Sequence, residues 1–589
     1  MARRMKPVDV VLVGVGWTAG ILAKGLAEAG YSVVGLERGR FQQTVPDFQA
    51  PAMHDELKYA VRYGLMQNTA KHTVTFRNTP DQEALPMRQL GSFLPGTDLG
   101  GAGVHWNGQT WRFLPSDFKA RSHNTERYGR GFIAKDLTVQ DWPVTYEDLE
   151  PYYDRFEYLC GIGGKAGNLR GNIQKGGNPH EGPRQREFPN PPMKQAYAGQ
   201  LFAVAAAQLG YAPFAVPSAN MTRNYTNPDG ARMMACMYCG FCERFGCEHY
   251  AKASPLTTVL PFALANKNFE LRTGANVVRV NWDRQAKRAT GVTYIDGQGR
   301  EIEQPAETVV LCAFAFHNPY LMLLSKIGTP YDPKTGEGVV GKNYTYQTMS
   351  SVSVFYDESV NINPFMGAGA LGTAIDDFNG DNFDHSRVGF IGGGYVACYT
   401  TGGRPIQYHP VPPGTPRWGL EWKRAVARHY NHTTSVGVHG ASMASRGNYM
   451  DLDPTYTDIY GNPLPRLTFD FPDNDRRMSD YITARAAEIA ELMGGQRVDK
   501  SGLSEHYSVV PYQTTHNTGG AIMGENPKDS VVNRYLQSWD LPNLFVVGSA
   551  NFPQNPGYNP TDTVGALAYW LLDALLKDYL PNPRALVQA

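Results

Sequence analysis

The fold of this chain is decided by the stretch Val8–Arg38, VDVVLVGVGWTAGILAKGLAEAGYSVVGLER. An apolar run predicts a buried strand and leads into Gly14-Val15-Gly16-Trp17-Thr18-Ala19. Small and apolar residues from Ala19 to Gly30 predict a helix, and Ser32 to Leu36 predicts a second strand that ends at Glu37. Strand, glycine turn, helix, strand and acidic residue in this order are typical of a dinucleotide-binding βαβ unit.

Each residue of this fingerprint has a physical role. Gly14 allows the tight turn, Gly16 lets backbone approach a pyrophosphate, and Ala19 keeps the helix close to the sheet. The N-terminus of the helix presents its positive dipole end to the phosphates. Glu37 can accept hydrogen bonds from a ribose diol and repels a 2′-phosphate, so we expect the cofactor to be FAD or NAD. Arg38, the next residue, is a further candidate for cofactor binding. A glycine turn in an ordinary parallel sheet is the alternative interpretation.

Length and charge exclude some classes of protein. The chain has 589 residues, enough for at least two domains. Lys plus Arg equals Asp plus Glu at 55 each, without a basic block, so nucleic acid is not an expected partner. An apolar run of 18 residues is absent from the sequence, so we expect no membrane span. We do not expect Arg3-Arg4 to begin a cleavable export signal, because Asp9 interrupts the apolar run that follows.

Four of the seven cysteines crowd into Cys236-x2-Cys239-x2-Cys242-x4-Cys247. Thiolates at these spacings can converge on one metal centre, either an iron–sulfur cluster or zinc. Structural zinc usually shows two separated pairs, so we favour a cluster, with zinc and free buried thiols as alternatives. We expect the isolated Cys160, Cys312 and Cys398 to be inert.

A second glycine-rich segment runs from Gly100 and Gly101 through Ala102 and Gly103, and then reads Val-His-Trp-Asn-Gly. Such small residues let a loop press its backbone against a flat cofactor or its phosphates. The candidate cofactor residues here are Gly100, Gly101, Gly103, His105, Asn107 and Gly108.

Together with the C-terminal motifs His516–Gly524 and Asn559-Pro560-Thr561, these segments resemble the glucose-methanol-choline (GMC) family of FAD oxidoreductases. The resemblance implies an α/β Rossmann-like FAD-binding domain and an α+β substrate domain with an antiparallel sheet. We expect the first over residues 1–45, 85–125, 256–335 and 500–589. We expect the second, together with partner-docking excursions and the cysteine cluster at 236–247, over 46–84, 126–255 and 336–499.

The resemblance implies specific roles. His516 is the expected base for the substrate hydroxyl, and Asn559 the residue that orients it, with His506 a weaker candidate base. Pro560 and Thr561 open a final helix whose N–H groups stabilise reduced flavin. Gly548 and Ser549 are expected at the flavin ribityl and phosphate groups, and Val278 beside the adenine.

In relatives, the histidine of the Gly-Gly-x-x-x-His-Trp motif can be joined to the flavin 8α-methyl group, so His105 is the candidate for a covalent link. Related multi-subunit dehydrogenases also carry a three-iron cluster, which implies [3Fe-4S] here. Cys242 and Cys247 are its expected ligands, together with Cys236 or Cys239.

Within the family, the chain is similar to the flavoprotein subunits of membrane-bound sugar-acid dehydrogenases. This implies oxidation of D-gluconate to 2-dehydro-D-gluconate, with an Arg or Lys facing the anionic substrate. It also implies a multihaem cytochrome c subunit and a small subunit that carries the export signal, at the periplasmic face of the membrane. Alternatives are a neutral sugar or polyol substrate, an O2-dependent oxidase, a non-catalytic nucleotide-binding protein with a zinc knot, and a cytoplasmic location.

The helix expected to start near Tyr146 places Asp148, Glu150, Asp154 and Glu157 on its polar face. Charges at this spacing usually form a solvated helix face, so we expect no chemistry from them.

Overall fold

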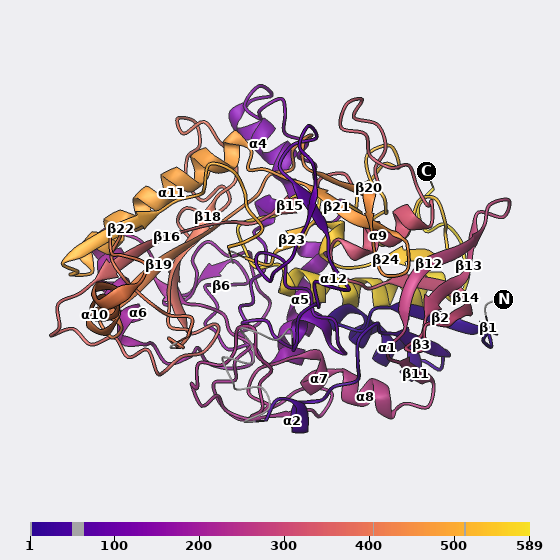
Figure 1. The fold of residues 1–589 in the computed structure, drawn as a ribbon, viewed down its shortest axis with the longest axis horizontal. Helices are drawn as coiled ribbons and strands as arrows, with labels where there is room; N and C mark the ends of the chain where they lie inside the picture. Colours follow the sequence, from indigo (N-terminus) through magenta and orange to yellow (C-terminus); the bar gives the residue numbers. More distant parts are fainter. Residues whose placement is uncertain (1–2, 50–63, 405, 512–513, 589) are drawn as a thin grey trace.

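A computed structural model describes residues 3–49, 64–404, 406–511 and 514–588 of the chain. Residues 50–63 of the expected substrate-domain segment 46–84 lie outside the described residues, as do residues 1–2, 512–513 and 589 of the expected FAD-binding segments. The molecule has two main sheets, which lie toward opposite ends of its long axis (Figure 1).

The first sheet contains the βαβ unit and has the strand order β11-β3-β2-β14-β13-β12, with β1 and β24 also paired to β14. The pairs among β11, β3, β2, β14 and β24 are parallel, whereas β12, β13 and β14 form an antiparallel meander. The strands are β1 (Arg3–Arg4), β2 (Val8–Val13), β3 (Val33–Leu36), β11 (Phe269–Arg272), β12 (Asn276–Asp283), β13 (Arg288–Ile295), β14 (Glu301–Leu311) and β24 (Leu544–Val546).

Helix α1 (Trp17–Glu28) follows β2 after a turn at residues 14–16, begins two residues earlier than expected, and ends before Gly30. Gly14 adopts φ +83°, and a Cβ atom on it would lie 3.1 Å from the Cα of Ala313. Glycine therefore makes the turn into the helix possible, as the sequence predicts. Helix α12 (Thr561–Ala574) packs against α1 so closely that a Cβ on Gly25 would lie 2.4 Å from Leu572.

The second sheet is antiparallel throughout, in the order β22-β16-β19-β18-β17-β8. The long helix α11 (Asp473–Leu492) lies along it and packs on β16 and β19 (Figure 1). This is the α+β second unit that the resemblance implies. Its strands are β8 (Phe214–Ala215), β16 (Thr348–Phe355), β17 (Gly372–Ile375), β18 (Gly394–Tyr399), β19 (Thr433–Gly440) and β22 (Arg497–Ser501).

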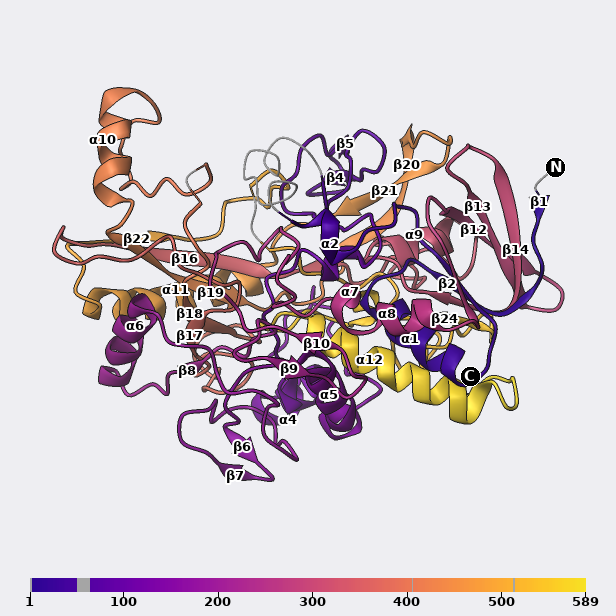
Figure 2. The same cartoon turned by 90° about the horizontal axis from the view of Figure 1, so that it is seen from below.

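Smaller elements connect the two sheets. The remaining strands are β4 (Thr75–Arg77), β5 (Leu85–Pro86), β6 (Asn168–Leu169), β7 (Asn172–Ile173), β9 (Tyr225–Thr226), β10 (Arg232–Met233), β15 (Thr345–Tyr346), β20 (Tyr449–Thr457), β21 (Pro463–Thr468) and β23 (Asn517–Thr518). The remaining helices are α2 (Thr44–Asp47), α4 (Ala120–Tyr128), α5 (Tyr146–Cys160), α6 (Tyr197–Gln208), α7 (Pro255–Thr258), α8 (Leu260–Ala265), α9 (His317–Leu324) and α10 (Gly419–His429). Figure 2 shows α10 standing out from the body of the molecule. Among the described residues, every helix is too short or too polar to cross a bilayer.

Helix α5 corrects one expectation. Glu150 and Glu157 are 6% and 1% exposed, so they do not belong to a solvated face. Arg112 donates to Glu150 Oε1 at 2.9 Å and to Glu157 Oε2 at 2.8 Å, and Arg184 also pairs with Glu157. Buried carboxylates require such partners, and the guanidinium groups hold the pKa of Glu157 below its usual value.

Candidate functional site

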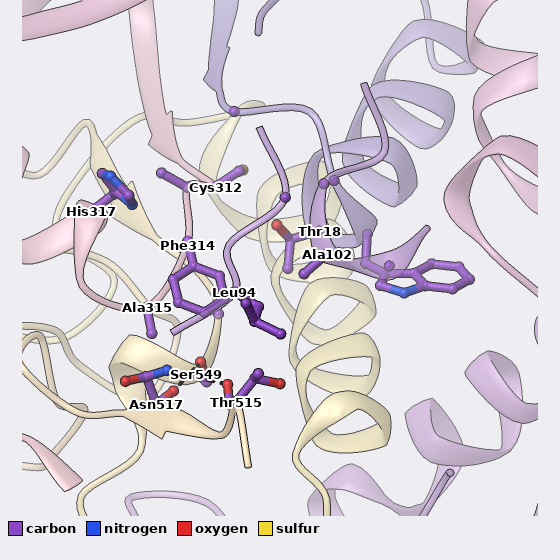
Figure 3. Close-up of a pocket in the computed structure, with 18 of the residues that line it drawn as sticks. Thr18, Leu94, Ala102, Cys312, Phe314, Ala315, His317, Thr515, Asn517 and Ser549 are labelled. Carbon is purple, nitrogen blue, oxygen red and sulfur yellow. Dashed lines mark hydrogen bonds between the residues drawn. The ribbon is translucent and has the colours of Figure 1, made fainter. Parts of the chain in front are cut away.

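A cavity of about 310 Å³ opens at the carboxyl ends of the parallel strands, where ligands bind in open α/β sheets. The turns after β2, β3, β14 and β24 all contribute to its wall. In Figure 3, Thr18 and Ala102 lie on one side of the cavity, with Phe314 and the group Thr515, Asn517 and Ser549 across from them. The cavity therefore joins the nucleotide fingerprint to the C-terminal motifs.

Most of the predicted cofactor residues line this cavity. They are Gly14, Gly16, Glu37, Arg38, Gly100, Gly101, Gly103, His105, Asn107, Val278, Gly548, Ser549, Asn559, Pro560 and Thr561. Two predicted residues do not line it. Ala19 is fully buried in α1, in keeping with its expected packing role, and Gly108 lies beside Asn220.

The glycines leave a cradle for the backbone approach of a dinucleotide. A Cβ on Gly16 would meet only the backbone of Gly100, at 3.7 Å, so its other side is open to the cavity. By contrast, a Cβ on Gly103 would lie 2.4 Å from Trp17 Nε1, so this loop can approach α1 only as glycine. The cradle lies at the N-terminus of α1, which favours a phosphate group.

Glu37 lies at the end of β3 and is buried. Its carboxylate accepts hydrogen bonds from the backbone N–H groups of Val15 at 2.9 Å and Gly39 at 3.1 Å. Burial nevertheless raises its pKa. The two bonds hold the carboxylate at the cavity wall, where each oxygen keeps a lone pair for a ribose hydroxyl group.

Arg38 lies beside Glu37, and its Nη1 is 3.0 Å from His317 Nε2. Burial lowers the pKa of both side chains, and Arg38 further lowers the pKa of His317. Because an arginine is always a donor, the His317 Nε2 atom is the acceptor of this bond. Arg38 thus gives this end of the cavity a positive charge, with the neutral His317 beside it.

His105 is 5% exposed, and its Nε2 atom has no hydrogen-bond partner among the described residues. Burial, with a further contribution from Lys252, lowers the pKa of His105 to about 3. The imidazole is therefore neutral at ordinary pH, and a buried nitrogen lone pair on the cavity wall fits a covalently held cofactor.

His516 lies beside Gln347 because of strand pairing. Strands β15 and β23 are antiparallel, with Tyr346 opposite Asn517, so the next position along places Gln347 opposite His516. Gln347 Nε2 donates to the carbonyl of Gly557 at 2.7 Å, which turns Gln347 Oε1 toward His516 Nδ1. His516 therefore carries its proton on Nδ1 and presents the Nε2 lone pair to its surroundings.

Asn559 lies just before α12, and its Nδ2 atom is 3.3 Å from His516 Nε2. Tyr395 on β18 donates to Asn559 Oδ1 at 2.9 Å. This bond places the amide oxygen toward Tyr395 and the NH2 group toward His516, and the same hydroxyl group lies 2.9 Å from Gln109 Oε1. The structure thus brings together the two C-terminal motifs that are 43 positions apart in the chain.

A second histidine, His439, lies on the cavity wall next to this pair. It is opposite Tyr395 in the antiparallel sheet, and the two rings stack at 4.9 Å. Burial lowers the pKa of His439 to about 4 and that of His516 to about 3, and His439 further lowers the pKa of His516. Both imidazoles are therefore neutral near pH 7. The weaker candidate, His506, pairs with Asp470 on the surface, where its side chain is 63% exposed.

The cysteine segment contacts this site, since the backbone N–H of Arg244 donates to the carbonyl of His105 at 2.6 Å. The thiols of Cys236, Cys239, Cys242 and Cys247 act on one another electrostatically, and burial raises the pKa of Cys236 to about 12 and that of Cys242 to about 11. However, no group of three or more His, Cys, Asp or Glu side chains within the described ranges is arranged to hold a metal ion. The expected iron–sulfur cluster is therefore not supported by this arrangement of side chains.

Sequence reasoning missed several residues at this site. His439 on β19 lines the cavity, whereas Gln347, between β15 and β16, and Tyr395 on β18 contact the pair His516 and Asn559, and no local motif marks these three residues. Glu243 and Arg244 also line the cavity and lie inside the cysteine motif. The sequence signal for Glu243 and Arg244 was the presence of two adjacent charged residues between Cys242 and Cys247.

Comparisons with known proteins agree with this geometry. GMC oxidoreductase family models match residues 140–349 and 444–568. The chain is 50% identical to the gluconate 2-dehydrogenase flavoprotein of Pantoea cypripedii, over 100% of this chain and 97% of that protein. It is 30% identical to the 2-methyl-1,2-propanediol dehydrogenase of Mycolicibacterium austroafricanum, over 95% and 93%.

The fold is also similar to that of a solved structure. The pyridoxine 4-oxidase from Mesorbium loti matches with a TM-score of 0.58 and 18% identity, over 97% of this chain and 100% of that chain. The family models and the relative at 50% identity show that the chain belongs to the GMC oxidoreductase family, as an FAD-dependent oxidoreductase that acts on CH–OH groups.

Proposed function

We propose that this protein oxidises a secondary hydroxyl group of a sugar acid, with D-gluconate as substrate and 2-dehydro-D-gluconate as product. The supporting observation is the pair His516 and Asn559, whose Nε2 and Nδ2 atoms lie 3.3 Å apart. One substrate oxygen can lie within hydrogen-bond distance of both atoms. FAD bound in the cavity supplies the acceptor for the hydride.

In this proposal each residue has one task. His516 Nε2 accepts the hydroxyl proton, because Gln347 keeps the single N–H proton of the neutral ring on Nδ1. Asn559 Nδ2 donates to the same oxygen and orients the carbon that loses its hydride. The glycine cradle, Glu37 and Arg38 would hold the nucleotide part of FAD, and His105 Nε2 would hold the flavin covalently.

Gluconate is preferred because the relative at 50% identity over the whole chain is a gluconate 2-dehydrogenase flavoprotein. A neutral sugar or polyol is the second candidate, because the relative at 30% identity acts on a neutral diol according to its name. We further propose a periplasmic complex with a cytochrome c subunit and a small subunit bearing the export signal, which rests on the resemblance alone. The [3Fe-4S] cluster likewise remains a prediction that rests on the cysteine motif and the family resemblance, and iron and acid-labile sulfide analysis tests it.

The experiment is an assay of purified flavin-loaded enzyme with an artificial electron acceptor and gluconate, glucose, fructose or sorbitol. We expect gluconate to give the highest kcat/KM, and His516→Ala to lower kcat by about 10²- to 10⁴-fold while flavin stays bound. His506→Ala is the matched control, because this exposed histidine lies outside the cavity wall, and it should retain wild-type activity. Turnover of neutral sugars only would contradict the gluconate assignment.

A further inference from the structure

Cationic side chains line the cavity at its two ends. Of the described lining residues, those with a permanent or near-permanent positive charge are Arg38, Lys71 and Arg244. Arg38 and Lys71 belong to one end, since both act on His72 and Arg38 follows Glu37 directly. That end is taken by the nucleotide fingerprint, which leaves Arg244 as the cation for the rest of the cavity.

Arg244 lies in the half of the cavity that contains His105, His439 and His516, which we call the catalytic half. Its backbone N–H donates to the carbonyl of His105 at 2.6 Å, which joins the cysteine segment to the candidate flavin-attachment residue. Its neighbour Glu243 acts electrostatically on His439, and His439 in turn acts on His516. All of these residues line the same cavity.

A second guanidinium group, that of Arg404, lies close to the guanidinium group of Arg244. Its Nη2 donates to Gln407 Oε1 at 3.0 Å, and Arg404 Nε donates to the same oxygen at 3.1 Å. Arg404 is 8% exposed and is anchored by a bond from Nη1 to the carbonyl of Gly240 at 2.6 Å. Glu243 Oε1 lies 3.9 Å from Arg244 Nε.

We propose that Arg244 binds the carboxylate group of the substrate and so selects sugar acids over neutral sugars. This inference rests on the proposed function. The carboxylate carbon of a 2-hydroxy acid is bonded directly to the carbon that is oxidised, so its binding group must lie in the catalytic half of the cavity. A guanidinium group offers a carboxylate paired donors, and the side chain of Arg244 is only 17% exposed, which limits screening by solvent.

The test compares D-gluconate with sorbitol as substrates of the flavin-loaded enzyme. For Arg244→Gln we expect the KM for gluconate to rise tenfold or more, with kcat changed much less and the kinetics with sorbitol unchanged. Arg244→Lys keeps the charge but not the paired donors, so it should lose less than the glutamine variant. Arg417→Gln removes an exposed arginine that does not line the cavity, and should match the wild type.

The outcomes separate the two proposals. If wild-type enzyme oxidises gluconate and Arg244→Gln, with normal flavin content, leaves its KM unchanged, the carboxylate assignment is wrong and the proposed function stands. An equal loss with gluconate and sorbitol would also overturn the assignment, because it would show a general role in the site. If the wild type oxidises sorbitol but not gluconate, both proposals fail. If the glutamine variant loses its flavin, Arg244→Lys is used in its place, and its KM for gluconate and its kinetics with sorbitol are compared with those of the wild type.

Discussion

The side-chain oxygen of Gln347 accepts the Nδ1 proton of His516, and its amide nitrogen is held by the carbonyl of Gly557 at 2.7 Å. A flipped amide would place two hydrogen-bond acceptors, the amide oxygen and the Gly557 carbonyl, against each other. Gln347 therefore selects the His516 tautomer whose Nε2 atom can take a proton from the substrate. It is a positioning residue for the proposed base.

Replacing Gln347 with methionine tests this relationship. Methionine keeps a similar side-chain length but cannot accept the Nδ1 proton in the same way, so both tautomers become populated and the ring loses its orientation. We expect kcat to fall by about ten- to a hundredfold, part of the full contribution of a general base, with KM changed little. Flavin content and the melting temperature check that the fold is intact. An unchanged kcat would remove Gln347 from the mechanism.

Tyr395→Phe should weaken the orientation of Asn559. The Tyr395 hydroxyl group donates to Asn559 Oδ1 at 2.9 Å, and one such bond contributes about 0.5–1.5 kcal/mol. We expect kcat/KM to fall by about two- to tenfold, measured in the assay with an artificial electron acceptor described above. Tyr399→Phe is the matched control, since its hydroxyl group contacts Gln109 and Tyr395 but not Asn559. Equal losses in both variants would show that the network, and not the bond to Asn559, matters.

The pH dependence of catalysis follows from the burial of His516. Its pKa is lowered from 6.5 to about 3, so the neutral form persists as pH falls until that lower value is approached. Between about pH 8 and pH 5 we therefore expect kcat/KM for sorbitol not to fall, whereas an ordinary histidine base would lose activity around pH 6.5. Sorbitol is the suitable substrate because it does not titrate in this range. An acid limb near pH 6.5 that disappears in His516→Ala would contradict the prediction.

A covalent link through His105 makes a prediction about flavin release. Wild-type protein precipitated with acid should keep its yellow colour in the pellet, because the neutral His105 Nε2, which has no hydrogen-bond partner in the described part of the chain, is the proposed attachment atom. His105→Ala should release the flavin to the supernatant under the same treatment. Absorbance of the two fractions measures the result. Complete release from the wild type would show that the cofactor is bound without a covalent bond.

The sequence predicts those parts of the protein that depend on neighbouring residues. The turn at Gly14 needs a positive φ, and the helix that follows needs small residues to approach the sheet, so the βαβ unit can be recognised in the residues themselves. The C-terminal motifs with His516 and Asn559 are likewise visible as short segments, although only the family resemblance indicates their roles.

The tertiary structure decides which distant residues meet. Gln347 and His516 are 169 positions apart and become neighbours through the register of β15 and β23, and Tyr395 reaches Asn559 across 164 positions. Glu157 looks like a surface charge in the sequence, yet the fold encloses it with two arginines. Helix periodicity and turn geometry are local steric properties that a short sequence carries. The protonation state and orientation of a side chain depend instead on burial and on partners supplied by strand pairing, which only the folded chain provides.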